Sequence, residues 1–219
     1  MNKILIFIVC ASASYLLGAI PFGYIIAQAK GIDIRRVGSG NIGATNVFRT
    51  VGKGWGILTF LCDVLKGFIP AFFFPLILER FSMAEGKLAL SIVCACFAVA
   101  GHNWPVYLRF KGGKGVATSA GALLGVAPVP LIIGLISWLA IFMFTRYVSL
   151  ASITAALAIP VSGWFLYFKQ SSLIPSGILA PALLTLLGLA AVWRHKSNIQ
   201  RLIRGNEHRF EFGRKNHKV

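Results

Sequence analysis

Long apolar stretches alternate with short polar loops along most of the chain. Several of these stretches approach the roughly 20 residues that an α-helix needs to cross a bilayer. They cover residues 4–29, 55–78, 88–104, 147–168 and 174–193. We predict a membrane-spanning helix in each, because an apolar run of this length is typical of a segment that is solvated by lipid.

Another apolar stretch, residues 116–145, is long for a single span. Pro128 and Pro130 lie near its middle. Proline lacks the N–H that a helix interior needs, and its ring clashes with the preceding turn. The stretch is therefore predicted to form two helices, the first unusually short, which brings the expected number of spans to about seven.

The basic residues fall mainly on alternate loops. With the N-terminus placed outside, the inner segments hold Lys30, Arg35, Arg36, Arg49, Lys53, Arg109, Lys111, Lys114, Arg146 and the basic residues from Arg194 to Lys218. The outer segments hold only Lys3, Arg80, Lys87 and Lys169. Because cytoplasmic loops collect Lys and Arg, we predict an all-α integral membrane protein with its N-terminus outside and its C-terminus cytoplasmic. Residues 1–219 are expected to form one polytopic domain with a short basic tail from about residue 194.

Composition supports this prediction and limits the classes of binding partner that we expect. The chain is 57% hydrophobic and 13% charged, with a mean hydropathy of +0.76. The net charge is +16, but the basic residues are dispersed and match no nucleic-acid-binding module, so we expect lipid and anionic substrates as partners and no nucleic acid. The six acidic residues are scattered and the four cysteines lie in predicted spans, so neither a metal site nor another cofactor is expected.

The first polar loop, residues 38–49, is rich in glycine and hydrogen-bond donors. Its candidate ligands are Ser39, Asn41, Gly43, Thr45, Asn46 and Arg49. Glycines let backbone N–H groups approach an anion, and an arginine offers a charged fork, so this composition suits a phosphate. A glycine-rich turn that only packs two helices is the alternative. The loop also matches GxGxxG, but no βαβ unit surrounds it, so we regard that match as accidental.

The second polar loop, residues 101–118, places His102, Gly112, Gly113, Lys114 and Gly115 just before a predicted helix. A helix N-terminus carries unpaired N–H groups and a partial positive charge, and it attracts anions. The loop is no nucleotide-binding P-loop, because Gly115 stands where a Ser or Thr would bind magnesium.

The third polar loop, residues 194–207, follows the last span. If the helix continues, His195, Asn198 and Arg201 share one face. Alternatively, this stretch is a basic segment that attracts anionic lipid.

Polar residues also occur inside or at the ends of predicted spans. Asp63 and Lys66 are spaced i,i+3 within an apolar helix, where ionisable groups suggest either function or a structural ion pair that orients the first polar loop. Ser149 opens another span on the inner side and is either a further donor or a packing residue.

These motifs, in this order, resemble the bacterial acyl-phosphate-dependent glycerol-3-phosphate acyltransferase family over almost the whole chain. The resemblance rests on residues 39–46 with Arg49, on residues 101–102 and 110–118, and on Arg194, His195, Asn198, Ile199, Arg201, Gly205 and Glu207. It implies seven membrane helices with the three polar loops in the cytoplasm of a bacterium. It also implies transfer of an acyl group from acyl phosphate to the 1-hydroxyl of glycerol 3-phosphate. The products would be lysophosphatidic acid and phosphate, in the first acylation of phospholipid synthesis, linked functionally to the enzyme that makes acyl phosphate.

The resemblance and the residue chemistry together assign roles to the polar residues. We assign catalysis to Ser39, Arg49, Lys114, His195 and Asn198. Substrate binding is assigned to Asn41, Gly43, Thr45, Asn46, His102, Gly112, Gly113, Gly115, Ser149, Arg201 and Glu207, and a structural or orienting role to Asp63 and Lys66. The base stays open between His195, His102 and a phosphate oxygen of the donor, and we favour the donor with His195 orienting. Ser39 lacks a nucleophile elbow, so an acyl-enzyme is the less favoured route.

Two other classes of protein fit part of the sequence. A phosphate or organophosphate transporter also needs anion-binding loops between spans, but it is typically built from paired repeats with broken helices, and none is evident here. A membrane scaffold explains the hydropathy but gives the three polar loops no purpose.

Overall fold

The computed structural model describes residues 2–81 and 83–210, and these residues contain no β-strand. The α-helices are α1 Lys3–Ala19, α2 Phe22–Gln28, α3 Ala44–Thr50, α4 Lys53–Phe73, α5 Ile77–Arg80, α6 Lys87–Asn103, α7 Val116–Val126, α8 Pro128–Thr145, α9 Val148–Phe168, α10 Leu179–Arg194 and α11 Lys196–Ile203. Short 3₁₀ turns lie at Phe74–Leu76, Ala84–Gly86 and Val106–Leu108. The all-α prediction is confirmed for this part of the chain.

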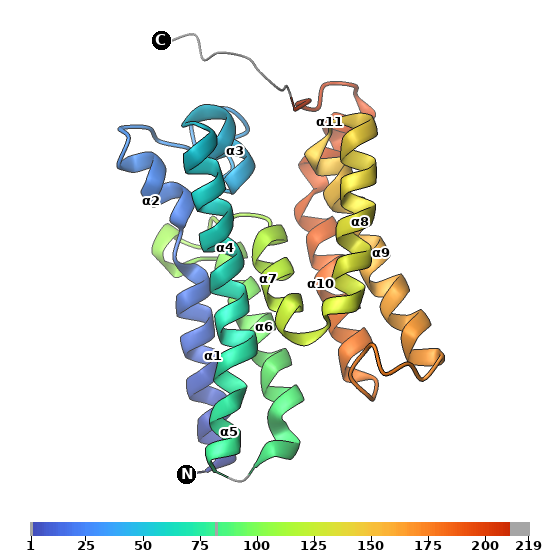
Figure 1. The fold of residues 1–219 in the computed structure, drawn as a ribbon. Coiled ribbons are helices and arrows are strands. Elements are labelled where there is room, and N and C mark those ends of the chain that lie inside the picture. The colour runs from blue at the N-terminus through green and yellow to red at the C-terminus, as the bar shows by residue number, and fades with distance from the viewer. Residues whose placement is uncertain (1, 82, 211–219) are drawn as a thin grey trace.

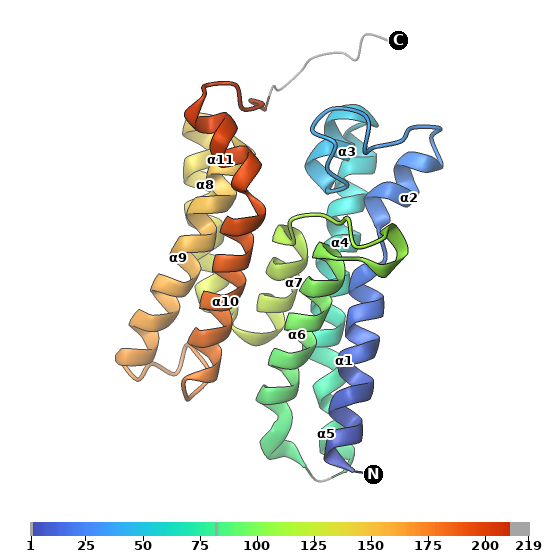
Figure 2. The same ribbon diagram turned by 180° about the vertical axis from the view of Figure 1, so that it is seen from behind.

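The helices form two groups with α7 between them (Figures 1 and 2). One group contains α1, α4 and α6, and the other contains α8, α9 and α10. Close packing of α7 on α4 depends on small residues: a Cβ at Gly67 would overlap the Thr118 carbonyl, and one at Gly121 would overlap the Val64 carbonyl. Such contacts are typical of helices that associate within a membrane.

Five segments are long and apolar enough to cross a bilayer: Lys3–Gln28, Lys53–Arg80, Lys87–Leu108, Pro128–Thr145 and Val148–Phe168. The apolar helices α7 and α10 are shorter. Five long and two short helices are compatible with seven spans, but the number of spans and the orientation of the termini stay predictions.

Prolines lie at two of the breaks between helices. The predicted division of residues 116–145 is confirmed, because α7 ends at Val126 and α8 begins at Pro128. The stretch 4–29 was expected to be one helix, but it breaks between Ala19 and Phe22. Pro21 explains this break, since the residue before a proline is pushed out of the helical region.

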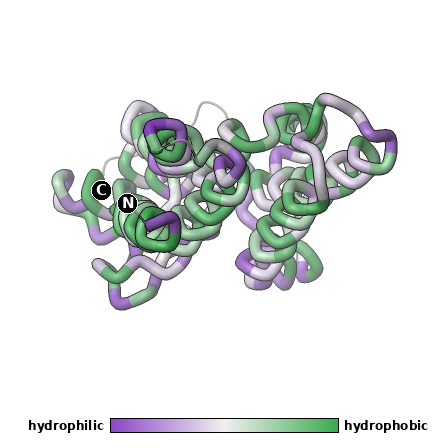
Figure 3. The backbone as a smooth tube through the Cα atoms, turned by 90° about the horizontal axis from the view of Figure 1, so that it is seen from below, coloured by the Kyte–Doolittle hydropathy of each residue, from purple (hydrophilic) through white to green (hydrophobic). Residues whose placement is uncertain are grey.

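The exterior of the helices is apolar and many polar side chains point inward. Large hydrophobic residues such as Ile8, Phe60, Leu139 and Phe165 are exposed, as expected for surfaces that face lipid. Figure 3 shows hydrophobic residues predominating along the helices. The buried polar residues include Asn46, Asp63, Lys66, His102, Asn103, Thr118, Ser149, His195 and Asn198. Of the predicted basic tail, Arg214, Lys215 and Lys218 lie outside the described residues.

Candidate active site

The three polar loops converge between the two helix groups. Helices α3 and α11 lie at the end opposite the N-terminus, and the loop before α7 lies deeper between the groups (Figures 1 and 2). Residues that are far apart in the sequence are thereby brought within hydrogen-bonding distance.

Lys114 is the point where the second and third loops meet. Its ammonium donates a hydrogen bond to Oδ1 of Asn198. The pKa of Lys114 is lowered to about 8, chiefly by burial. The neighbouring guanidinium groups of Arg201 and Arg194 contribute to this lowering, and the Glu207 carboxylate opposes it. An anion that binds beside Lys114 stabilises the protonated ammonium, because a nearby negative charge raises the pKa of a lysine.

Glu207 connects the residues around Lys114. Its Oε1 accepts hydrogen bonds from Asn198 Nδ2 at 2.7 Å and from Ser149 Oγ at 3.0 Å, and its Oε2 accepts one from Arg201 Nε at 2.7 Å. Burial raises the pKa of this carboxyl, but the three hydrogen bonds outweigh burial and keep its pKa below the ordinary value. A charged carboxylate repels phosphate, so this geometry favours an orienting role for Glu207 over direct substrate binding.

His195 lies between α10 and α11 and is buried. Its Nδ1 lies 2.8 Å from the Ala191 carbonyl oxygen. A carbonyl only accepts hydrogen bonds, so Nδ1 carries the proton and Nε2 of the neutral ring keeps its lone pair. Burial lowers the pKa of His195 to about 4, helped by the charge on Lys114. The ring is therefore a neutral hydrogen-bond acceptor at neutral pH and a weak base.

Arg194, for which no role was predicted, holds the carbonyls of two glycines in the second loop. Its Nε donates to the Gly113 carbonyl and its Nη2 to the Gly112 carbonyl, each at 3.0 Å. Gly115 adopts a left-handed φ of +80° at the start of α7, a conformation that glycine tolerates best. Gly112, Gly113 and Gly115 therefore shape the backbone on both sides of Lys114.

In the first polar loop, Asn46 organises the backbone. Its Nδ2 donates to the carbonyls of Ile34, Val37 and Asn41, and its Oδ1 accepts from the Ser39 N–H. The amide of Asn46 is thus fully used by the loop, which leaves little capacity for the substrate contact that the sequence suggested.

The side chain of Asn41 also has a local role, because its Oδ1 accepts the Gly43 N–H at 2.8 Å just before α3. Ser39 is exposed, and Thr45 and Arg49 are half-buried. Within the described residues, Arg49 has no ion pair within 4.0 Å. These three side chains keep polar groups for a ligand.

Glu207 and Phe210, which follow α11, lie close to residues of the first polar loop. Arg49 is close enough to Glu207 for the carboxylate to raise its pKa, although burial is the larger effect and lowers it. The Phe210 ring lies 5.2 Å from that of Phe48 and 5.4 Å from that of Phe142, measured between centroids. Phe210 therefore connects α3 with α8 beside the polar residues.

Behind the second loop lie three buried ionisable residues. Lys66 Nζ and Asp63 Oδ1 are 2.8 Å apart, which confirms the ion pair considered from the sequence. His102 is only 5% exposed, and a Cβ added at Gly113 would overlap its Nε2. The His102 ring therefore supports the loop from inside the protein, and its contact with substrate stays a prediction.

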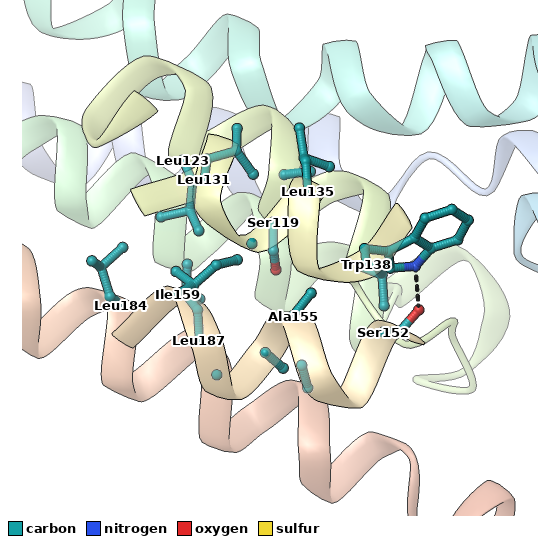
Figure 4. A pocket seen from close by; sticks show the side chains of 16 residues that line it. Ser119, Leu123, Leu131, Leu135, Trp138, Ser152, Ala155, Ile159, Leu184 and Leu187 are labelled. Atoms are coloured by element: carbon teal, nitrogen blue, oxygen red, sulfur yellow. Dashed lines mark hydrogen bonds between the residues drawn. The ribbon is translucent and has the colours of Figure 1, made fainter. Parts of the chain in front are cut away.

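An apolar cavity opens beside the polar residues, between α7, α8, α9 and α10 (Figure 4). Its lining includes Val116, Leu123, Leu131, Ile159, Leu184 and Ala191. The indole N–H of Trp138 donates to Ser152 Oγ at 3.2 Å in its wall. Val116 is two residues from Lys114, and Ala191 is the partner of His195, so the cavity lies near the polar site. Among the described residues, no group of three His, Cys, Asp or Glu side chains is placed to hold a metal ion.

The chain is similar to known proteins over nearly its full length. Residues 8–205 match the family model described as glycerol-3-phosphate acyltransferase. The glycerol-3-phosphate acyltransferase of Aquifex aeolicus is 44% identical, with 90% of this chain and 95% of the relative covered. That of Desulforamulus reducens is 45% identical, with 92% and 93% covered.

A solved structure agrees with these matches. The crystal structure of PlsY, an integral membrane glycerol 3-phosphate acyltransferase, in its glycerol 3-phosphate form superposes with a TM-score of 0.80 at 40% identity and covers 94% of this chain and 96% of that chain. The lysophosphatidic acid form gives a TM-score of 0.78, also at 40% identity, with 94% and 95% covered. This chain therefore belongs to the glycerol-3-phosphate acyltransferase family of integral membrane proteins.

Proposed function

We propose that this protein transfers a fatty acyl group from acyl phosphate to the 1-hydroxyl of glycerol 3-phosphate, giving lysophosphatidic acid and inorganic phosphate. The observation that carries the proposal is that Lys114, Asn198 and His195 lie close to an apolar cavity, whose lining includes Val116 and the His195 partner Ala191. One substrate is polar and twice charged, and the other joins a charged head to an apolar tail. A basic cluster close to an apolar cavity is complementary to both.

The relatives support the acceptor and the product. The matched PlsY structures represent a glycerol 3-phosphate form and a lysophosphatidic acid form. The donor is inferred from chemistry. An acyl phosphate is a mixed anhydride with a good leaving group, so the enzyme needs neither a covalent nucleophile nor a metal to activate it.

The reaction requires charge compensation, because two phosphates approach each other in a partly dry site. Arg49 and Lys114 supply positive charge, and Ser39 and Thr45 add donors at the edge of the first loop. Asn198 fixes the direction of the Lys114 ammonium. We assign Lys114 and the glycine segment (Gly112, Gly113 and Gly115) to binding the phosphate group of glycerol 3-phosphate. Arg49 and Ser39 are assigned to binding the phosphate of acyl phosphate.

The low basicity of His195 indicates which group accepts the hydroxyl proton of glycerol 3-phosphate. The O1 oxygen of glycerol 3-phosphate attacks the acyl carbon, the bond from that carbon to the phosphate oxygen breaks, and the hydroxyl proton passes to the departing phosphate. With a pKa of about 4, His195 is a poor base for this proton. Its Nε2 is suited to accept a hydrogen bond from the hydroxyl and orient it.

The cavity gives the acyl chain a place beside the reacting carbon. Its wall is formed by aliphatic side chains of α7 to α10. We place the protein in the bacterial cytoplasmic membrane with seven spans, its N-terminus outside and the polar loops in the cytoplasm. Glycerol 3-phosphate then arrives from the cytosol and the acyl phosphate arrives from the inner leaflet, where the enzyme that makes it would be a functional partner.

The test is acyl transfer by the purified protein, reconstituted in lipid without added metal. Palmitoyl phosphate and palmitoyl-CoA are compared as donors to labelled glycerol 3-phosphate. We expect lysophosphatidic acid from palmitoyl phosphate alone. Lys114→Ala should lower kcat/KM by about a hundredfold, whereas Lys111→Ala, which removes an exposed lysine from the same loop, should stay within about twofold. Folded protein that forms no product, or that prefers the thioester, would overturn the proposal.

A further inference from the structure

The buried group behind the second loop takes no part in the reaction as derived above. Asp63 and Lys66 belong to α4, and His102 to α6. Asp63 Oδ1 lies 2.8 Å from Lys66 Nζ and 3.6 Å from His102 Nδ1. Ionisable side chains in a helix surrounded by lipid are costly, and they are retained where they serve a purpose.

His102 supports the glycine segment through both its backbone and its ring. Its carbonyl accepts the Gly113 N–H at 3.1 Å. Its Nε2 occupies the space where a Cβ of residue 113 would lie. On the other side of the segment, the guanidinium of Arg194 binds the carbonyls of Gly112 and Gly113. The segment that precedes Lys114 is therefore held between His102 and Arg194.

The orientation of the His102 ring depends on Asp63. Among the described residues, His102 Nδ1 has no hydrogen-bond partner, and the Asp63 carboxylate is the charged group beside it. Lys66 fixes that carboxylate and also donates to the Ile20 carbonyl at 2.8 Å, where α1 ends. The ion pair is thus attached to the backbone at the end of α1, which fixes the position of the Asp63 carboxylate beside the His102 ring.

We infer that Asp63, held by Lys66, positions Lys114 through the His102 ring and so sets the affinity for the phosphate of glycerol 3-phosphate. Asp63 is a positioning residue in this arrangement, because Gly113 lies between His102 and Lys114. The inference rests on the proposed function in giving Lys114 that phosphate as its ligand. It differs from the expectation that the ion pair orients the first loop, since the contacts lead to the second.

The variant to test is Asp63→Asn/Lys66→Met, which removes both charges and leaves no unpaired ion in the membrane. We expect KM for glycerol 3-phosphate to rise about tenfold, with KM for acyl phosphate within about twofold. The control is Ser91→Ala, which removes a buried hydrogen bond from α6 to the Ala71 carbonyl. If both KM values rise, or if Ser91→Ala raises KM for glycerol 3-phosphate equally, the effect is a general loosening of the packing and the inference is overturned.

A double-mutant cycle tests the route through the ring. If Asp63 acts through His102, adding Asp63→Asn/Lys66→Met to His102→Gln raises KM no further than His102→Gln alone. Additive effects would overturn the assignment of His102 as the intermediary.

Hydrogen exchange gives a readout that does not need catalysis. The peptide that covers residues 110–118 should exchange faster in Asp63→Asn/Lys66→Met than in the wild type, and at the wild-type rate in Ser91→Ala. Unchanged exchange together with an unchanged KM would refute the positioning role. If the wild type showed no acyl transfer at all, the proposed function would fail, and the exchange rates would still decide this inference.

Discussion

The guanidinium of Arg194 is bonded to the carbonyl oxygen of Gly113, with 3.0 Å between Nε and the oxygen, although 81 residues separate the two in sequence. The bond joins the end of α10 to the loop before α7, and therefore one helix group to the other. Because the adjacent Gly112 carbonyl binds the same guanidinium, the planar fork holds two consecutive peptide groups. The spacing between Lys114 and the third loop thus depends on Arg194.

We predict that Arg194→Lys lowers kcat/KM for glycerol 3-phosphate about tenfold or more, because an ammonium keeps the charge but cannot bridge two carbonyls in the same plane. Steady-state kinetics in lipid measure the effect. Lys196→Ala, two residues further on and exposed, is the matched control and should remain near wild type. Full activity of Arg194→Lys would mean that charge alone is required at this position.

Activity should depend on the charge of Lys114. Its pKa is lowered to about 8, chiefly by burial, so the ammonium is mostly protonated near pH 7 and increasingly neutral above pH 8. A neutral amine attracts phosphate poorly, and kcat/KM for glycerol 3-phosphate is therefore expected to fall as pH rises through about 8.

The matched variant for this pH dependence is Lys114→Arg, because a guanidinium stays charged throughout the accessible range. Its activity is expected to be lower, but the decline near pH 8 should disappear from its profile. His195, with a pKa of about 4, contributes no titration near neutrality. A decline that persists in Lys114→Arg would assign it to another group.

We expect loss of the Asn46 side chain to lower stability and loss of the Ser39 hydroxyl to lower activity. Asn46→Ala removes four hydrogen bonds that hold the first loop, and we expect it to lower the free energy of unfolding by about 2–4 kcal/mol. Ser39→Ala removes only an exposed hydroxyl, so its melting temperature should match the wild type while kcat falls about tenfold. Thermal unfolding in detergent, measured beside kinetics, separates the two. Equal melting temperatures would contradict the structural role of Asn46.

Local features of this protein could be predicted from the sequence, and features that depend on distant partners could not. The break at Pro128 follows from one residue and its neighbours. The role of Asn46 does not, because its amide binds the Ile34 carbonyl twelve residues earlier and so holds the backbone of the loop before α3. His102 and Glu207 were predicted as functional residues from the sequence, but their partners, Gly113 and Ser149, lie on other segments. Whether a polar residue contacts substrate or supports its neighbours is decided by such long-range contacts.

The apolar cavity predicts a limit on acyl chain length. Ala155 of α9 lines it, and its small side chain leaves space between α8 and α10. Ala155→Leu adds volume inside the cavity without adding polarity, so a long chain loses room while a short one keeps its contacts. We expect kcat/KM to fall about tenfold for a long-chain acyl phosphate and to change little for a medium-chain one.

Leu157→Phe is the matched control for this prediction, because Leu157 lies on the same helix and is 52% exposed on the lipid side. Competition between two acyl phosphates in one reaction measures the preference directly, since the ratio of products equals the ratio of kcat/KM values at equal donor concentrations. A shift toward the shorter chain in Ala155→Leu, absent from Leu157→Phe, places the acyl tail between α7 and α10. An equal loss for both donors would instead indicate damage to the polar site, and the tail would then have to follow the lipid-facing surface of the helices.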